Sequence, residues 1–145
     1  MNTFKLLLPA ALAGALLFSS PAQAAEDATH FQLSPAIMQK LKSAEADMKA
    51  LQKPDAAEPE VDPDQSIEAA IRKIDQDSQT SAVLAKHGLT GRELVMSAHA
   101  LLHAGTFVSL EPGMDQQQRA TTYQGYTKEQ QANIDLIRNM TGARK

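Results

Sequence analysis

The stretch Thr90-Gly-Arg-Glu-Leu-Val-Met-Ser-Ala-His-Ala-Leu-Leu-His-Ala-Gly105 decides the fold of this chain. It begins with the pattern of a capping box, which predicts that the Thr90 hydroxyl accepts a hydrogen bond from the Glu93 backbone N–H and that the Glu93 carboxylate accepts one from the Thr90 backbone N–H. The segment behind this box is the most apolar one outside the N-terminal region. We therefore expect a central helix that runs through Val108 and ends at Glu111-Pro-Gly113.

A helical wheel, which turns about 100° per residue, predicts how the central helix is oriented. With Leu94 at zero, an apolar face gathers within about 80° of it and comprises Ala98, Leu101, Leu102 and Gly105. His99, His103 and Met96 fall at about 140°, 180° and 200° on the same wheel. The wheel therefore predicts that the leucines face the core and that these three residues share the outer face.

His99 and His103 are one helical turn apart, a spacing at which two imidazoles can bind one metal ion. The Met96 thioether would add a soft ligand, so zinc or copper is the metal that this pattern indicates. The ligand set is incomplete, because the chain has no cysteine. The alternative is that both histidines are partly exposed polar residues on a helix flank, or contacts to a neighbouring helix.

Helix signals also flank the central segment. Ser34-Pro35 caps and opens a first helix, which ends before Pro54 and has an apolar stripe of Ile37, Leu41, Ala44, Met48 and Leu51. Another helical segment begins at Gln65, is broken by the cap-forming residues 75–81, and closes at Gly88 in the left-handed conformation.

Thr127-Lys-Glu-Gln130 is a second capping box and opens a final helix that ends at Gly142. Two further stretches lack an apolar period. Residues 25–33 indicate an irregular leader. Residues 114–126 indicate a long polar connection, in which residues 115–120 could form a loose helical turn.

These signals predict an all-α fold, a small irregular bundle of about five helices in one domain. Aromatic residues make up 4% of the chain and Trp is absent, which favours helices over a β-sandwich. We expect a cleaved signal peptide at 1–24, a leader and first helix at 25–53, an acidic proline-rich linker at 54–64 and a helical core at 65–145. The linker carboxylates do not follow the spacing of a calcium loop.

The N-terminal sequence predicts export. Lys5 precedes an apolar run from Leu6 to Phe18, and Ala22-Gln23-Ala24 is the small-x-small pattern that a signal peptidase cleaves. The run is shorter than the roughly 20 apolar residues that span a membrane. We therefore expect cleavage after Ala24 and a periplasmic mature protein without a membrane span.

Cleavage would change the charge balance. Residues 1–24 hold one Lys and no acid, so the 14 basic residues become 13 against 17 acidic residues, a net charge of −4. This balance argues against nucleic acid as a partner, because phosphate binding needs a concentrated basic surface. The absence of cysteine excludes disulfides, iron–sulfur clusters and c-type haem attachment.

No nucleophile motif or phosphate-binding glycine loop indicates an enzyme. The sequence predicts a secreted, non-enzymatic helical protein with a structural or protein-binding role and no cofactor. One alternative is a periplasmic metal-binding protein that uses His99, His103 and Met96. Another is an envelope chaperone or inhibitor with an exposed apolar groove.

A protein partner would be an unidentified protein or a second copy, because residues 34–53 can form a homodimer by exchange between two chains. We prefer an arrangement in which this first helix docks on its own domain, since a small core needs its apolar stripe.

The segments Leu84-Ala-Lys-His-Gly-Leu-Thr and Asn133-Ile-Asp-Leu-Ile-Arg-Asn139 resemble those of small secreted bacterial all-helical proteins of unknown function. The shared features are the Gly-Leu-Thr junction, the capped apolar helix behind it and the Asn-led apolar segment, which together cover residues 82–139. The resemblance implies a helical fold and carries over no functional residue.

Overall fold

The computed structural model describes residues 27–51 and 66–142, and these ranges are helical without a strand. The elements are η1 (Ala28–His30), α1 (Pro35–Leu51), α2 (Ile67–Gln76), α3 (Ser78–Lys86), α4 (Gly91–Leu110), η2 (Glu111–Gly113), α5 (Gln116–Gln124) and α6 (Lys128–Thr141). The all-α class is confirmed, with six α-helices in the described ranges instead of about five. The predicted signal peptide and the acidic linker lie outside the described residues.

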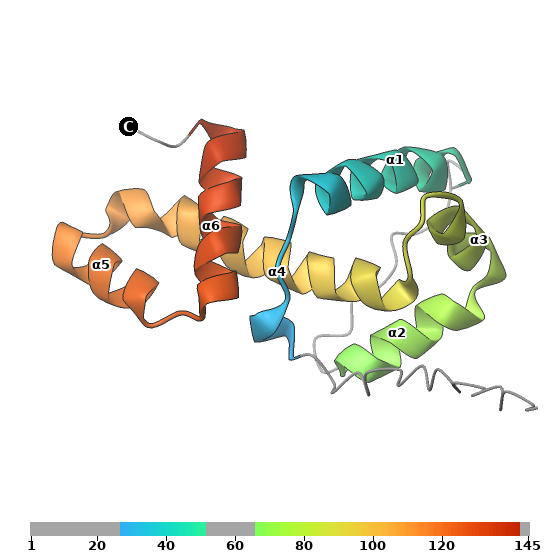
Figure 1. The fold of residues 1–145 in the computed structure, drawn as a ribbon, viewed down its shortest axis with the longest axis horizontal. Helices are drawn as coiled ribbons and strands as arrows, with labels where there is room; N and C mark the ends of the chain where they lie inside the picture. The colour runs from blue at the N-terminus through green and yellow to red at the C-terminus, as the bar shows by residue number, and fades with distance from the viewer. Residues whose placement is uncertain (1–26, 52–65, 143–145) are drawn as a thin grey trace, which may run out of the picture.

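The central helix α4 is the axis around which the other elements are arranged (Figure 1). Helices α1, α2 and α3 gather around its N-terminal half, whereas α5 and α6 lie at its C-terminal half. The first hydrophobic cluster consists of Ala44, Val83, Leu84 and Leu89, with Leu94 of α4 packed against it. The second consists of Ala104, Phe107 and Ile134. Helix α4 therefore contributes to both clusters and joins them.

The two predicted capping boxes are confirmed. The Glu93 N–H donates to Thr90 Oγ1 at 3.1 Å, and the Thr90 N–H donates to Glu93 Oε2 at 2.8 Å. The Gln130 N–H donates to Thr127 Oγ1 at 3.2 Å, and the Thr127 N–H donates to Gln130 Oε1 at 3.0 Å. Both boxes satisfy backbone donors that the first turn of a helix leaves unpaired.

The predicted break between α2 and α3 is also confirmed. Asp77 ends α2 and caps α3, because its carboxylate accepts from the Gln79 N–H at 3.1 Å. At the end of α3, Gly88 has a φ of +64°, a conformation that glycine adopts without steric cost. Leu89 follows and is buried against the first cluster, so the turn directs the chain into α4.

Helix α1 docks on its own domain, as we preferred. Ala44 is fully buried, and Leu41 and Met48 pack against the first cluster. Lys40 Nζ donates to the Gly88 carbonyl at 3.0 Å, so a polar contact adds to the apolar one. A homodimer through residues 34–53 would have to compete with these contacts.

Two segments that the sequence indicated to be irregular are more ordered than expected. The connection at 114–126 contains a helix, α5, because Asp115 and Gln118 form a third capping box. The part of the leader that is described, residues 27–33, is attached to the domain: Asn133 Nδ2 donates to the Phe31 carbonyl at 2.8 Å, and Leu33 is buried. Neither segment has an apolar period, because few of its side chains enter the core.

The wheel prediction for α4 is wrong as well. The buried face combines small side chains with Val95, Met96 and Phe107, whereas Leu102 is 70% exposed. The buried residues of α4 are Gly91, Val95, Met96, Ser97, Ala100, Ala104 and Phe107. Helices α2 and α6 and the η1 segment all contact α4, so it has no single inner stripe. The neighbouring elements therefore decide which side of α4 is buried, and Leu102 lies outside their contacts.

No helix in the described ranges combines the length and hydropathy needed to cross a membrane.

Candidate functional site

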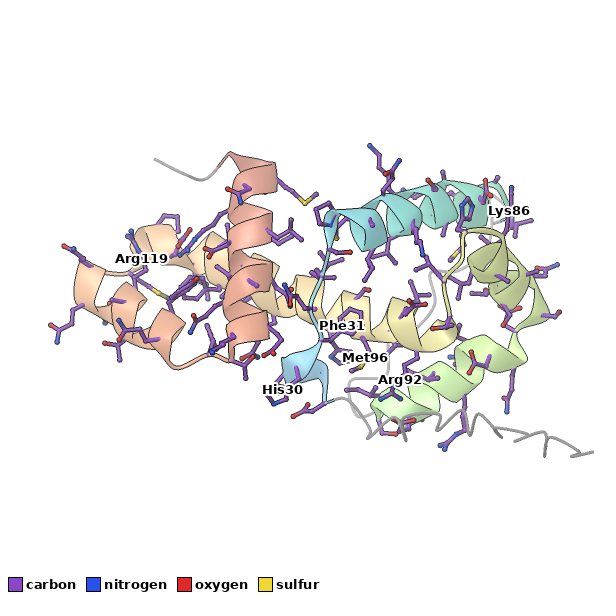
Figure 2. All side chains as sticks on the ribbon, viewed as in Figure 1. His30, Phe31, Lys86, Arg92, Met96 and Arg119 are labelled. Carbon is purple, nitrogen blue, oxygen red and sulfur yellow. The ribbon has the colours of Figure 1, made fainter. Side chains whose placement is uncertain are left out.

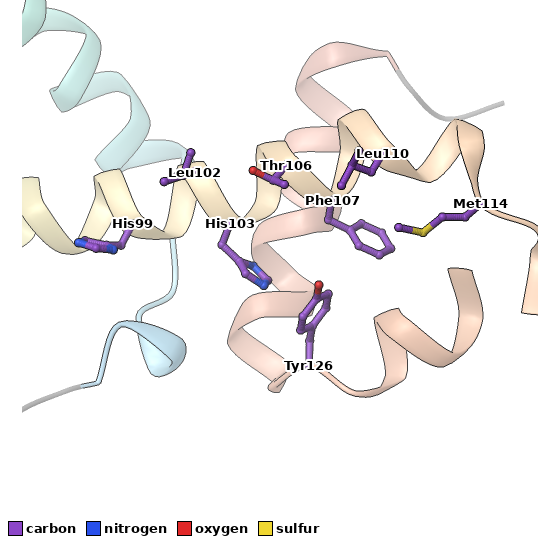
Figure 3. A pocket seen from close by; sticks show the side chains of 8 residues that line it. All are labelled: His99, Leu102, His103, Thr106, Phe107, Leu110, Met114 and Tyr126. Atoms are coloured by element: carbon purple, nitrogen blue, oxygen red, sulfur yellow. The ribbon is translucent and has the colours of Figure 1, made fainter. Parts of the chain in front are cut away.

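An open groove of about 360 Å³ runs beside the C-terminal half of α4 (Figure 3). We call it the α4 groove, and it is lined by His99, Leu102, His103, Thr106, Phe107, Leu110, Met114 and Tyr126. Six of these residues come from α4, where spacings of three and four residues place side chains on one side of the helix. The other two come from the segments on either side of α5.

Tyr126 is positioned by the start of α6. It immediately precedes the capping residue Thr127, and its carbonyl accepts a hydrogen bond from Gln131 Nε2 at 3.0 Å. Its backbone N–H donates to the Tyr123 carbonyl at 3.3 Å. These contacts fix the backbone from which the Tyr126 ring reaches the groove.

Aromatic rings form the floor of the groove. Phe107 is 2% exposed, and the Tyr126 ring lies edge-on to it, with centroids 5.7 Å apart. Below this pair, the Arg138 guanidinium lies 5.5 Å from the Phe107 centroid and 5.1 Å from that of Tyr123. Arg138 also binds Glu111, with Nη2 2.5 Å from Oε2. The floor is therefore held by packing and by an ion pair that are both largely out of solvent.

His103 and His99 occupy one end of the groove. The His103 ring is edge-on to Tyr126, with centroids 4.4 Å apart and an interplanar angle of 82°. His99 is exposed, and Figure 3 shows its ring directed away from that of His103. Sharing one metal ion would therefore require a side-chain rotation.

The four histidines of the chain fall into two classes. His87 Nε2 lies 2.8 Å from Asp47 Oδ2, and His30 Nδ1 lies 3.4 Å from Glu129 Oε2. The two histidines of the groove, by contrast, have no hydrogen bond to any residue within 27–51 and 66–142. Their ring nitrogens are available to a ligand.

Met96 does not share the face of the two histidines. It is 1% exposed and is absent from the groove lining, so the predicted thioether ligand is out of reach. Figure 2 shows it where the chain following η1 passes α4, near Phe31. Met114 is the methionine that lines the groove. Within the described ranges, no three His, Asp or Glu side chains come together as a metal-binding group.

Sequence reasoning did not identify Phe107, Met114 and Tyr126 as site residues. Met114 and Tyr126 lie in the stretch interpreted as a polar connection, and they reach the groove only through the folding of α5 and α6. No local signal marks Tyr126, because it lies beyond the end of α5 and is placed by the start of α6.

The groove is electrically neutral apart from its histidines. From Leu94 to Leu110, α4 carries no Asp, Glu, Lys or Arg. Leu102 is 70% exposed and Leu110 is 56% exposed on the same side of the helix. A solvent-facing helix surface normally carries charges, so an uncharged one with two exposed leucines is typical of a contact surface.

Two further cavities lie near α1. One, of about 330 Å³, separates α1 from α4 and is lined by Leu41, Glu45, Met48, Lys49, Leu94, Ala98 and Leu101. The other, of about 500 Å³, is an open depression between α1 and α3, beside Asp47 and Lys86. Both cavities border the contact between α1 and the rest of the domain, whereas the lining of the α4 groove includes no residue of α1.

The chemistry of the α4 groove suits recognition of an apolar group, with two imidazoles at its edge. Comparisons with models of known families, with curated proteins and with solved structures give no match, so this interpretation is based on the residues of the site itself.

Proposed function

We propose that this chain is an exported, non-enzymatic helical protein that binds another protein through the α4 groove. The observation that carries the proposal is the pair of exposed leucines, Leu102 and Leu110, beside an aromatic-floored groove on an uncharged helix. Exposed apolar surface is costly in water and marks a contact site when it adjoins a recess. Protein interfaces are depleted in charge at their centre and enriched in Tyr, Phe and Met.

Photo-crosslinking tests the groove. A photoreactive phenylalanine analogue in place of Leu102 is expected to trap one discrete product in cells. The same analogue in place of Lys73, an exposed residue of α2, is expected to trap none. Equal labelling at both positions, or no product at either, would rule out the α4 groove as the binding surface.

Export is supported by the predicted signal peptide. In a Gram-negative host, the mature N-terminus is expected to be Ala25 in the periplasmic fraction. Ala24→Arg is expected to block cleavage, because the peptidase cleft accepts only small residues there. Gln23→Leu is the matched control, since the middle position of the small-x-small pattern is not restricted to small residues. A full-length chain in the cytoplasm would contradict the proposal.

Metal binding by His99 and His103 is the second candidate function. It is favoured by one observation, the absence of described hydrogen-bond partners on the two imidazoles. Calorimetric titration with Zn(II) or Cu(I) is expected to show binding that His99→Gln with His103→Gln removes. His30→Gln, which changes an exposed histidine outside the groove, should leave it intact. Binding that survives the double substitution would refute this assignment.

A further inference from the structure

We propose that the surface covered by residues 27–33 of the leader is a binding site for an extended segment of another protein, and that the leader is its internal competitor. We call this surface the leader site. It belongs to α6 and α4, which both contact the η1 part of the leader where it passes them (Figure 1). The α4 groove is a separate site, because its lining includes no leader residue.

Asn133 of α6 binds the main chain of the leader. Its Nδ2 donates to the Phe31 carbonyl at 2.8 Å, and its Oδ1 accepts from the Leu33 N–H at 2.7 Å. Phe31 has extended backbone angles, φ −81° and ψ 121°, and in an extended chain these two groups point to the same side. Every residue has a carbonyl, and every residue except proline has an N–H. Extended segments of many sequences can therefore form this pair of bonds.

Thr127, the capping residue of α6, also binds the main chain of the leader. Its Oγ1 donates to the Thr29 carbonyl at 2.6 Å. Between these two contacts, His30 Nδ1 lies 3.4 Å from Glu129 Oε2, but the His30 side chain is 59% exposed and such a pair contributes little. The leader site therefore recognises backbone groups along α6 more than it recognises charged side chains.

The leader site is formed without the leader. Asn133 adjoins Ile134, which is fully buried in the second hydrophobic cluster and packs α6 on α4. Neither hydrophobic cluster includes a residue of 27–33, and Leu33 is the one buried residue of that range. Segments with few buried apolar contacts open at a low cost in free energy. Opening of the leader would therefore expose Asn133 while α6 stays in place.

The contacts of the leader define the partner segment that fits the site. Leu33 is buried and Phe31 is half-buried, whereas Gln32 between them is exposed. Side chains two residues apart share one face of an extended segment. The partner segment therefore carries apolar residues at alternate positions. Proline is excluded at the position of Leu33, because it has no N–H for Asn133 to accept.

A different protein fits the site better than a second copy of this chain. The leader of a second copy would make the same contacts as the internal leader but would lack the local concentration that the covalent link provides. Two copies also repel each other, since each has a net charge of −3. A segment of another protein can displace the internal leader when its side chains fill the positions of Phe31 and Leu33 more completely.

Fluorescence polarisation with a labelled peptide tests the inference on the protein in the form in which cells accumulate it. The probe has the sequence of residues 27–35, Asp-Ala-Thr-His-Phe-Gln-Leu-Ser-Pro. The unmodified chain is expected to bind it weakly, because its own leader occupies the site. Phe31→Ala with Leu33→Ala in the protein weakens this competitor and is expected to tighten binding at least about tenfold. Leu51→Ala, at an exposed position of α1, is the matched control and should bind like the unmodified chain.

A modified probe tests the contact with Asn133 without altering the protein. N-methylation of the peptide at the position of Leu33 removes the N–H that Asn133 accepts. This change is expected to weaken binding to the doubly substituted protein at least about tenfold. N-methylation at the position of Gln32 is the matched control, since the Gln32 N–H donates no hydrogen bond to a residue within 27–51 and 66–142.

Three results would overturn the inference. The first is equal affinity of the unmodified and doubly substituted proteins for the probe, or no binding to either, while circular dichroism shows both to be helical. The second is an equal loss of affinity with both N-methylated probes. The third is a dimer of the unmodified chain in sedimentation equilibrium that the double substitution abolishes, because it would assign the site to a second copy. Crosslinking at Leu102 is independent of these results, so the proposed use of the α4 groove is judged separately.

Discussion

Asn133 and Leu33, which are 100 residues apart, are joined by a hydrogen bond of 2.7 Å from the Leu33 backbone N–H to Asn133 Oδ1. The amide of the same side chain donates to the Phe31 carbonyl at 2.8 Å. Asn133 is 1% exposed and Leu33 is 4% exposed, so both groups are out of water. A single side chain of α6 therefore satisfies two backbone groups of the leader and attaches it to the domain.

Asn133→Ala is expected to lower the free energy of unfolding by about 2–4 kcal/mol, because it leaves a buried N–H and a carbonyl without partners. Asn139→Ala, at an exposed position of the same helix, should cost no more than about 0.5 kcal/mol. Urea denaturation measures both values. Faster hydrogen exchange at the Leu33 amide would identify release of the leader as the cause, whereas equal stability of the two variants would contradict this role.

The ion pair between Arg138 and Glu111 gives a second prediction. Their side chains are 19% and 11% exposed, so removing one partner leaves the other charge largely desolvated. Arg138→Met or Glu111→Gln alone is expected to cost about 2–4 kcal/mol. The double variant should cost clearly less than the sum of the two.

The exposed pair of Lys49 and Glu45, at 68% and 61%, is the matched control. Its coupling energy is expected to be about 0.3–0.5 kcal/mol. Coupling energies of the same size in the two double-mutant cycles would show that burial does not strengthen the Arg138 pair.

The contact between α1 and α3 is expected to weaken in acid. Lys86 and, second, His87 hold the pKa of the Asp47 carboxyl below its usual value of 3.8 through hydrogen bonds. Since the folded-state pKa lies below the unfolded-state pKa, this carboxylate stabilises the folded chain above about pH 4. That stabilisation is lost as the pH falls through the folded-state value.

Asp47→Asn should therefore lower the melting temperature at neutral pH, and the difference from the unmodified chain should shrink below about pH 4. Thermal unfolding followed by circular dichroism at several pH values provides the comparison. A difference that stays constant down to about pH 2 would exclude the contribution of this carboxylate.

Local signals in the sequence predicted the helices that begin at caps. Thr90 with Glu93 and Thr127 with Gln130 form hydrogen bonds within one helical turn. Gly88 ends α3 through its own backbone conformation. These signals could be read from neighbouring residues without knowledge of the tertiary structure. Helix α5 was missed although Asp115 and Gln118 form a local capping box, because its residues show no apolar period; its Tyr123 Oη donates to Asp135 of α6 at 2.8 Å. The leader was missed because a distant residue, Asn133 of α6, binds it. Both contacts depend on how α6 is placed.

The candidate site was predicted in part. The outward position of His99 followed from the wheel, because this residue lies on the side of α4 that no other helix covers. The positions of Met96 and Leu102 were predicted wrongly, since a wheel ranks faces by hydrophobicity and α4 is apolar on most of its surface. Which face is buried depends on α2, α6 and η1, and their placement is not encoded in α4 alone.

Comparison of Met96→Ala with Leu102→Ala tests this reversal of faces. Met96 is 1% exposed, so its truncation leaves a cavity and is expected to cost about 2–4 kcal/mol. Leu102 is 70% exposed, and its truncation is expected to change stability by no more than about 0.5 kcal/mol at concentrations where the chain is monomeric. The two residues share one helix and have similar size, so helix propensity and side-chain volume are matched. A larger cost for Leu102 than for Met96 would show that the leucine face of α4 is the buried one and would remove the exposed surface on which the groove interface depends.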